Sequence, residues 1–280
     1  MEQNVFLDEV ELKRLMIQGR LLSEYEQPIY RKVIDGRKGL TLLDVGCNNG
    51  WKTKERFSDK NFKKIIGIDC LDQLVDQARE RFGNDVLSFY ACDVATEEFT
   101  EKLRQIMQKE NIHAFDIIHC SFMLMHTKEQ EDILKRLKTF LAPGGKLIVI
   151  EPDDSTSYMN PDPDGIYKEF LQVLSADPYA GKRNMGAELP GLFSNSGYTD
   201  IQLECSEIAS SGNEITKKEH IFDTFCAYLL EDLILLRQDA EGNSYQTEWE
   251  WVQKNLDKLR QLMTGEASTV SMGVKIYTCG

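Results

Sequence analysis

The sequence predicts an α/β fold: a doubly wound, mostly parallel seven-stranded sheet of the Rossmann-like kind, with helical lid insertions. Three observations predict it. Short apolar runs rich in β-branched residues alternate with helical patterns from Leu40 onward. Three of these runs end on a carboxylate, and a glycine-containing loop follows the first of them. A last strand pattern near the end of the chain would close the sheet.

The first elements follow one another without long interruptions. Residues 10–34 have a helical pattern, and five strand patterns come next, in the runs LTLLDV, KKIIGID, VLSFYACD, FDIIHC and KLIVIEP. Helical patterns at 71–82, 97–109 and 127–141 lie between them. Thr127 and Gln130 form a capping-box pattern at the start of the third helix. Pro143-Gly144-Gly145 is expected to end that helix before the fifth strand.

The pattern changes after Ile150. A polar, proline-rich loop is followed by a helix at 166–174 and a sixth strand at 199–208. Helices at 217–237 and 244–263 precede the final strand pattern at 268–280. We therefore expect an N-terminal helical lid segment, 1–39, and a main domain, 40–280, with helical insertions at about 154–185 and 212–264. Such helices would cover the carboxyl ends of the strands, where open α/β sheets bind ligands.

Composition narrows the classes of function. The 280 residues carry a net charge of −13, with 46 acids against 33 bases, and a phosphate backbone requires clustered cations. A nucleic-acid partner is therefore not expected. No run approaches the roughly 20 apolar residues of a membrane span, and no signal peptide is evident, so we expect a cytoplasmic protein with no membrane partner. Seven singly placed cysteines give no disulfide framework and no metal site.

Three predicted strands end on an acid: Asp44, Asp69 and Asp93. Because the carboxyl ends of parallel strands meet at one edge of a sheet, these carboxylates would line one pocket that prefers hydroxyls, amines and cations. Asp69 lies 19 residues beyond Gly50, the spacing at which an acid accepts ribose hydroxyls. Asp44 lies beside the loop and would repel a pyrophosphate, which disfavours a nicotinamide dinucleotide and favours an amine or sulfonium ligand.

The runs LLDVGCNNG, IIGIDCLDQLVDQA, YACDV and LKTFLAPGGKLIVIEPD resemble the successive motifs of class I S-adenosylmethionine-dependent methyltransferases. Within that superfamily the sequence is most similar to the small-molecule branch that includes the ubiquinone and menaquinone methylases. The resemblance covers residues 40–153 and extends loosely to 208. It implies S-adenosyl-L-methionine as cofactor, S-adenosyl-L-homocysteine as product, and a small-molecule methyl acceptor.

The resemblance also implies roles for the loop after the first strand. Gly46 and Gly50 would let the backbone approach the methionyl part of the cofactor, and Asp44 would favour its ammonium group. The family usually has a glycine where this chain has Asn48. Since asparagine tolerates left-handed backbone angles, we expect the turn to form here as well.

Further roles fall on the next strand ends. Asp69 would hold the ribose hydroxyls, Asp93 would accept the adenine amino group, and the backbone of Val94 would meet the ring. An alternative role for Asp93 is to cap a helix beginning near residue 96. The complete set of predicted cofactor-binding residues is Asp44, Gly46, Cys47, Asn48, Gly50, Asp69, Cys70, Asp93, Val94, Cys120 and Ser121.

A positioned base would help if the acceptor must lose a proton. The candidates near predicted strand ends are His119, His126, Glu151 and Asp153, and we name His126 and Asp153 as the catalytic candidates. For His126, packing beside the cofactor is the favoured alternative, and for His119 it is a hydrogen-bonded place in the core. Asp153 either lines the acceptor pocket or is simply solvated.

Other interpretations stay open at this point. A protein that binds S-adenosylmethionine as a non-catalytic sensor or scaffold would carry the same motifs. An RNA methyltransferase is disfavoured by charge, and a nicotinamide oxidoreductase by Asp44. The helices after Lys217 would serve as a homodimer surface if they are not a lid. The sequence does not identify the acceptor.

Overall fold

The computed structural model describes residues 9–60, 62–239 and 244–280. These residues form two compact units, each assembled from separate stretches of the chain. The first, here called the sheet unit, contains residues 25–152, 185–206 and 275–280. The second, the helical unit, contains residues 9–24, 153–184 and 207–274.

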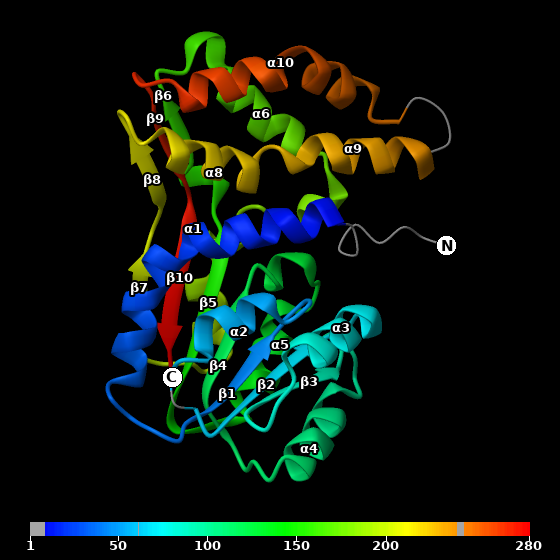
Figure 1. Ribbon diagram of the computed structural model, residues 1–280, viewed down its shortest axis with the longest axis vertical. Coiled ribbons are helices and arrows are strands. Elements are labelled where there is room, and N and C mark those ends of the chain that lie inside the picture. Colours follow the sequence, from blue (N-terminus) through cyan, green and yellow to red (C-terminus); the bar gives the residue numbers. More distant parts are fainter. Residues whose placement is uncertain (1–8, 61, 240–243) are drawn as a thin grey trace. The chain divides into compact units, whose positions relative to one another are not determined.

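The sheet unit is built on a seven-stranded sheet with the strand order β3-β2-β1-β4-β5-β10-β7 among the described residues (Figure 1). Neighbouring strands from β3 to β5 pair in parallel, whereas β10 and β7 pair antiparallel. The predicted sheet is therefore confirmed. The strands are β1 (Thr41–Val45), β2 (Lys64–Asp69), β3 (Leu87–Ala91), β4 (Phe115–Ser121), β5 (Leu141–Pro152), β7 (Gln202–Cys205) and β10 (Val274–Cys279).

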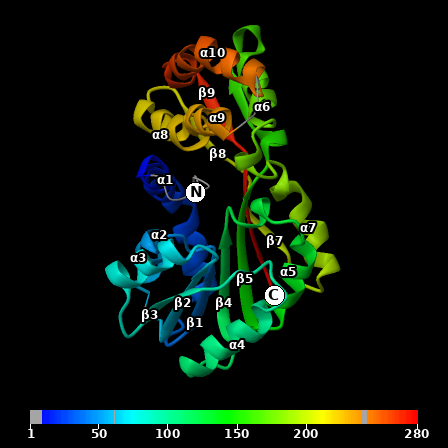
Figure 2. The same cartoon turned by 90° about the vertical axis from the view of Figure 1, so that its right-hand side faces the viewer.

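Helices cover both faces of this sheet, as a doubly wound fold requires. Figure 2 shows α2 and α3 on one side and α5 and α7 on the other. The part of α1 that belongs to the sheet unit lies on the face of α2, because Tyr30 contacts both Phe57 of α2 and His119 of β4. The helices are α1 (Glu9–Ile34), α2 (Trp51–Phe57), α3 (Asp72–Phe82), α4 (Phe99–Lys109), α5 (Gln130–Lys138) and α7 (Met185–Asn195).

Alternation along the strands divides the side chains between the two faces. Leu43 and Val45 of β1 and Ile118 of β4 join a buried apolar cluster with residues of α4, α5 and α7. Asp44 of β1 pairs in register with His119 of β4, so both side chains point to the opposite face, toward α1 and α2. The polar residues of β1 and β4 therefore meet on one side of the sheet.

The helical unit has its own small sheet, in the order β6-β9-β8, with all pairs antiparallel. Its helix α10 packs against α6, α8 and α9. The stretches that we expected as helical insertions belong to this unit, and none of the described helices is long and apolar enough to cross a membrane. The elements are β6 (Tyr158–Asn160), α6 (Ile166–Leu174), β8 (Ile208–Ser211), α8 (Ile215–Phe225), α9 (Tyr228–Asp239), α10 (Gln246–Thr264) and β9 (Thr269–Met272).

The expected final strand, 268–280, is two strands in different sheets. The change occurs at Gly273, between β9 of the small sheet and β10 of the large one. The Gly273 carbonyl accepts a hydrogen bond from the amide of Asp153 at 2.7 Å, and a Cβ atom at Gly273 would lie 2.0 Å from the Asp153 carbonyl oxygen. A residue with a side chain could not pass this point, so glycine allows the chain to change sheets here.

Two other elements differ from expectation. The sixth strand, predicted at 199–208, is limited to β7, and Ile208 already belongs to β8 of the small sheet. The helix predicted at 217–237 is broken into α8 and α9 at Cys226, whose φ of −124° leaves the helical region. Buried Cys226 contacts Met263 of α10 at 3.8 Å between the sulfur atoms. Residues 215–237 contain no glycine or proline, so the sequence pattern did not predict the break between α8 and α9. The break coincides with this packing of Cys226 against α10.

The helix predicted at 127–141 begins later than expected. A short 3-10 turn, η2 (Leu124–His126), precedes it, and α5 starts only at Gln130. The Thr127 hydroxyl donates to the Leu124 carbonyl at 2.9 Å, so the predicted capping box is wrong. Pro143-Gly144-Gly145 lies inside β5, at an irregularity in its pairing with β4, and not between helix and strand.

Candidate functional site

The loop between β1 and α2 makes a tight turn over residues 46–50. Gly46, Asn48 and Gly50 have φ angles of 76°, 51° and 76°. The amides of Gly46 and Cys47 donate to the Ile68 carbonyl of β2 at 2.9 and 3.0 Å, which holds the loop against the end of that strand. Asn48 thus adopts the left-handed conformation that its side chain tolerates, and the expected turn forms without the usual glycine.

The two glycines of this loop are in different surroundings. Gly46 is exposed, so its backbone is accessible to a ligand. Gly50 is buried, and a Cβ atom there would lie 2.7 Å from the Phe89 ring and 2.8 Å from Ala78. Packing therefore explains why position 50 requires a glycine: the missing side chain lets the start of α2 approach α3 and β3. Contact between either glycine and a cofactor stays a prediction.

Asp69 at the end of β2 faces the same loop. One carboxylate oxygen accepts the amide of Asn48 at 2.8 Å, and the other accepts the amide of Leu71 at 3.1 Å. Burial raises the pKa of Asp69 from its ordinary value, although these backbone donors oppose the effect. A carboxylate has further lone pairs, so Asp69 still has acceptor capacity for hydroxyl groups. Its neighbour Cys70 is exposed.

Asp93 follows β3 and is half-buried. One of its carboxylate oxygens accepts the amide of Ala95 at 2.8 Å, which forms a local turn. The alternative role as a helix cap is wrong, because α4 begins only at Phe99. Val94 is buried and belongs to the apolar cluster, so its backbone, as predicted, is the part available to a ligand.

The remaining predicted cofactor residues lie near the ends of β1 and β4. Cys47 and Cys120 are buried, and burial raises the pKa of both thiols well above the usual range. Cys120 packs in the apolar cluster, so it would meet a ligand only through its backbone. Ser121 is half-buried and accepts a hydrogen bond from Arg56 at 3.2 Å.

Asp44 lies in a buried hydrogen-bond network. Its side chain accepts from the Thr53 hydroxyl of α2 at 2.5 Å and lies 2.7 Å from Nδ1 of His119. His119 Nε2 lies 3.0 Å from the Tyr30 hydroxyl of α1. Burial opposes ionisation of Asp44, but the hydrogen bond and charge of His119 outweigh it, so the pKa of Asp44 is below its ordinary value. The expectation that His119 is a hydrogen-bonded core residue is confirmed.

A buried ion pair lies beside this network. Arg56 of α2 donates two hydrogen bonds to Glu26 of α1, at 2.8 and 2.7 Å, and both side chains are at most 7% exposed. Burial disfavours the charged form of each partner, but the attraction and hydrogen bonds between the two outweigh it. The pKa of Glu26 is therefore lowered and that of Arg56 is raised. Two parallel hydrogen bonds of this kind fix both side chains in orientation as well as in charge.

The candidate bases are spread over both units. His126 is exposed on η2 of the sheet unit. Glu151 is buried, and one of its oxygens accepts the amides of Met123 and Leu124 at 3.0 and 2.7 Å, so it holds the loop after β4. Asp153 is buried in the helical unit, where it accepts from the Ser155 hydroxyl. The catalytic roles of His126 and Asp153 stay predictions.

The sheet brings the predicted cofactor residues to one edge. Because β3, β2, β1 and β4 are neighbours and parallel, Asp93, Asp69, Asp44 and Ser121 all lie within two residues of the carboxyl ends of four consecutive strands. Within the part of the chain that the structure describes, no cluster of three potential metal ligands occurs. The arrangement suits a ligand that carries hydroxyl and amine groups.

Sequence reasoning missed the residues that support this edge: Glu26, Tyr30, Thr53 and Arg56. All four are buried polar residues on helices. The only signal was the run WKTKERF, in which Thr53 and Arg56 are three residues apart and therefore share a helix face with Phe57. Hydropathy assigns such residues to the surface, so the buried face of α2 was not visible in the pattern.

A family model described as a methyltransferase domain matches residues 19–203. The chain belongs to this methyltransferase family. The match contains every predicted cofactor-binding residue together with Glu26, Tyr30, Thr53 and Arg56. It also includes two stretches of the helical unit, residues 19–24 and 153–184.

Curated relatives of this methyltransferase differ in their named reactions. The chain is 33% identical over 127 residues to a tRNA U34 carboxymethyltransferase of Pseudoalteromonas atlantica, covering 43% of this chain and 36% of the relative. It is 28% identical over 124 residues to a ubiquinone biosynthesis O-methyltransferase of Coxiella burnetii, covering 43% and 48%. The chain thus matches less than half the length of either relative.

Solved structures share the fold. Phosphoethanolamine N-methyltransferase 2 of Haemonchus contortus, in complex with S-adenosyl-L-methionine, matches 98% of this methyltransferase and 58% of its own chain, with 14% identity and a TM-score of 0.52. The [4+2]-cyclase SpnF matches 99% and 85%, with 18% identity and a TM-score of 0.51. At these identities the likeness concerns the fold alone.

Proposed function

We propose that this methyltransferase transfers the methyl group of S-adenosyl-L-methionine to a small-molecule acceptor. The observation that carries the proposal is the row of carboxylates, Asp44, Asp69 and Asp93, within two residues of the ends of adjacent parallel strands beside an exposed Gly46 backbone. A nucleoside with an amino-acid tail presents the hydroxyl and amine groups that such a row prefers.

The residues at this edge fit the cofactor. Asp69 has acceptor capacity for the ribose hydroxyls, and Asp93 for the adenine amino group. Asp44 is ionised and has lone pairs beyond those used by Thr53 and His119, so it favours an ammonium group at the loop. Asn48, Cys47, Cys70, Val94, Cys120 and Ser121 complete the proposed contacts, the buried ones through their backbones.

The bound cofactor supplies an activated methyl group for in-line displacement. This chain's part is to hold and orient it and to provide a field that favours its positive charge. An oxygen or nitrogen acceptor also loses a proton, and we keep His126 and Asp153 as candidate acceptors for that proton, at an imidazole nitrogen and a carboxylate oxygen. No covalent protein nucleophile is needed.

The test is calorimetric titration of the full chain with S-adenosylmethionine, S-adenosylhomocysteine and NADH. We expect binding of the two sulfur compounds and none of NADH. Asp69→Ala removes a charged acceptor, and we expect about 10- to 100-fold weaker binding, since a hydrogen bond to a charged group contributes roughly 1.5–3 kcal/mol. The matched control is Asp76→Ala on α3, an exposed aspartate of the same unit. Equal affinities in both variants would refute the site.

One relative favours a second candidate. Because a matched relative is named a tRNA U34 carboxymethyltransferase, an RNA substrate is the alternative to a small molecule. The net charge of −13 argues against it, since RNA binding needs clustered cations. Tight binding of tRNA in a gel-shift assay, weakening steeply with salt, would reverse this choice. A sensor or scaffold would instead bind the cofactor and form no S-adenosylhomocysteine with any acceptor class.

The homodimer remains a prediction of its own. It would use the helices after Lys217, which correspond to α8, α9 and α10 of the helical unit. Light scattering of the purified chain over a range of concentrations gives the mass directly. A mass of about 32.1 kDa at every concentration would identify a monomer.

A further inference from the structure

Two chains of hydrogen bonds run from α1 to the proposed cofactor edge, both within the sheet unit. The first chain links Tyr30, His119, Asp44 and Thr53, with distances of 3.0, 2.7 and 2.5 Å. The second links Glu26, Arg56 and Ser121. Tyr30, His119, Asp44 and Thr53 are each at most 3% exposed. Polar groups at such depth are costly unless they are satisfied, so each link constrains the next.

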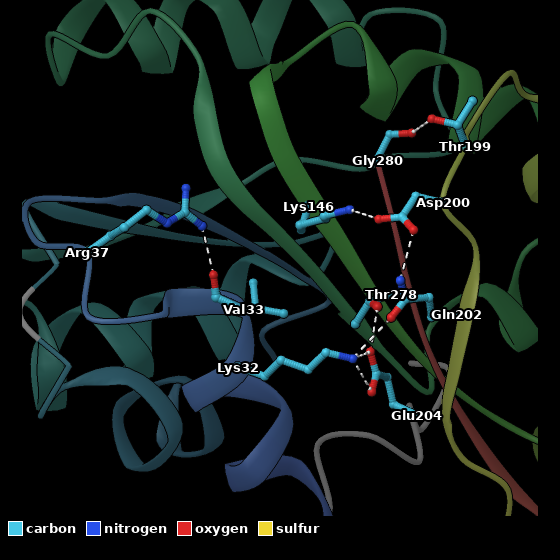
Figure 3. Close-up of polar contacts among 10 residues, drawn as sticks. All are labelled: Lys32, Val33, Arg37, Lys146, Thr199, Asp200, Gln202, Glu204, Thr278 and Gly280. Carbon is cyan, nitrogen blue, oxygen red and sulfur yellow. Dashed lines mark hydrogen bonds and ion pairs between the residues drawn. The ribbon is translucent and has the colours of Figure 1, made fainter.

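The end of α1 that starts these chains is fixed to the sheet. Figure 3 shows Lys32 reaching the strand β7, where its amine donates to Glu204 at 2.7 and 2.9 Å and to Gln202 at 3.0 Å. Arg37 donates to the Val33 carbonyl at the end of the helix, at 2.7 Å. Tyr30 therefore lies in a helix segment that contacts the rest of the sheet unit on either side of it, through the buried Glu26 and the exposed Lys32.

Asp44 is the member of the first chain that acts on the loop. It is the last residue but one of β1, and Thr53 lies in the first turn of α2, so their hydrogen bond joins the two sides of the turn at residues 46–50. The ionised carboxylate only accepts, so Nδ1 of His119 must carry a hydrogen and donate it to Asp44. The His119 ring is held in turn by Phe57, at 5.3 Å between ring centres, and by Tyr30 at 5.8 Å.

We propose that Tyr30 and His119 are positioning residues for the methyl donor, acting through Asp44 on the loop that would receive its amino-acid part. This inference rests on the proposed function, because it needs that ligand at that loop. Nothing in it requires Tyr30 or His119 to touch the ligand. A residue that only stabilises the fold would not distinguish between the two ends of the ligand. We expect Tyr30 and His119 instead to affect the binding of its amino-acid end and not that of its nucleoside end.

Tyr30→Phe removes the hydroxyl and keeps the ring. We expect the Kd of S-adenosylhomocysteine to rise about 3- to 10-fold, the usual range for residues that act through a network. The Kd of 5′-methylthioadenosine, which lacks the amino-acid part, should stay within twofold. The matched control is Tyr198→Phe: Tyr198 is 3% exposed and donates to the Leu134 carbonyl at 2.9 Å in the same unit, within the apolar cluster on the opposite face of the sheet from Asp44 and His119. It should lower the melting temperature similarly and change neither Kd.

Two variants of His119 test the direction of the contacts. In His119→Asn the amide nitrogen takes the place of Nδ1 and can still donate to Asp44. In His119→Gln the amide is placed near Nε2 and reaches Tyr30 instead. Both variants lose the ring contacts with Phe57 and Tyr30, so their losses of stability should be alike. Because His119→Asn keeps the donor to Asp44 but loses the link to Tyr30, we expect it to bind S-adenosylhomocysteine about 3- to 10-fold weaker than the unchanged protein, like Tyr30→Phe. His119→Gln, which loses the donor to Asp44, should bind more than about 30-fold weaker.

Each outcome decides a different claim. Equal S-adenosylhomocysteine affinities of Tyr30→Phe and Tyr198→Phe would overturn the positioning role, as would equal weakening of both ligands in Tyr30→Phe or equal affinities of the two His119 variants. Failure of the unchanged protein to bind S-adenosylhomocysteine would refute the proposed function, and the positioning role with it. The two failures are distinguishable because only the second appears without any substitution.

Discussion

The buried pair of Glu26 and Arg56 allows a quantitative prediction. The Arg56 side chain is 7% exposed and that of Glu26 is not exposed, and two charge-assisted hydrogen bonds of 2.8 and 2.7 Å join them. Glu26→Gln removes the negative charge, keeps the shape and turns an amide group toward a guanidinium that can only donate. Removing one partner of a buried pair typically costs about 3–5 kcal/mol. We expect a loss near the lower value, because Ser121 still accepts from Arg56.

The assay is urea unfolding at pH 7, followed by tryptophan fluorescence. Trp51 is the only one of the three tryptophans in the sheet unit, since Trp249 and Trp251 lie on α10, so a background with Trp249→Phe and Trp251→Phe reports on that unit. The slope of the transition should stay constant while the midpoint falls.

The matched control for Glu26→Gln is Glu204→Gln. Its partner Lys32 is 56% exposed, so that pair should contribute about 1 kcal/mol or less. The pKa of Glu26 is lowered, so its contribution is complete above the ordinary value of 4.5 and is lost as the pH falls below that. The difference between the unchanged protein and Glu26→Gln should therefore shrink only in acid. A loss from Glu26→Gln no larger than that from the control at pH 7 would refute the reasoning.

Two further predictions concern stability. Gly50→Ala should lower the free energy of unfolding by about 2–5 kcal/mol, because its Cβ atom would lie 2.7 Å from the Phe89 ring and its φ is 76°. Gly144 has a φ of 74° but open space around it, so Gly144→Ala should lower the same free energy by only about 1–2 kcal/mol in the urea assay. Burial and the neighbouring Asp177 raise the pKa of Asp232 to about 9, so the stability of the unchanged protein should fall by at most about 1.4 kcal/mol per pH unit between pH 4 and 9. Asp232→Asn should flatten that profile and be the more stable form at pH 8, and parallel profiles would contradict it.

The sequence predicted the parts of the site that depend on local order. Asp69 ends β2, Asp44 is the last residue but one of β1, and Asp93 lies two residues past β3. Parallel strands carry their ends to a common edge regardless of what packs around them. The same logic predicted the mostly parallel sheet. The turn at Asn48 was also predictable, because a single residue's tolerance for left-handed angles decides it.

The contacts behind that edge could not be predicted in this way. Arg56 and its partner Glu26 are 30 residues apart in the sequence, and His119 and Asp44 are 75 apart. Hydrophobic periodicity contains no information about such pairings. The small sheet was missed for a related reason. Its strands have only three or four residues and come from distant parts of the chain, so none carries a strand pattern strong enough to be recognised.

The place of β10 in the sheet has a consequence for how the protein is made. β10 lies between β5 and β7, yet it is synthesised after every other strand of the sheet. A nascent chain can therefore pair β3, β2, β1, β4 and β5 early, whereas β7, which among the described strands pairs only with β10, must wait until β10 has left the ribosome. The whole of residues 207–274 must emerge during that interval. Removing residues 274–279 would thus separate β7 from the sheet instead of trimming an edge.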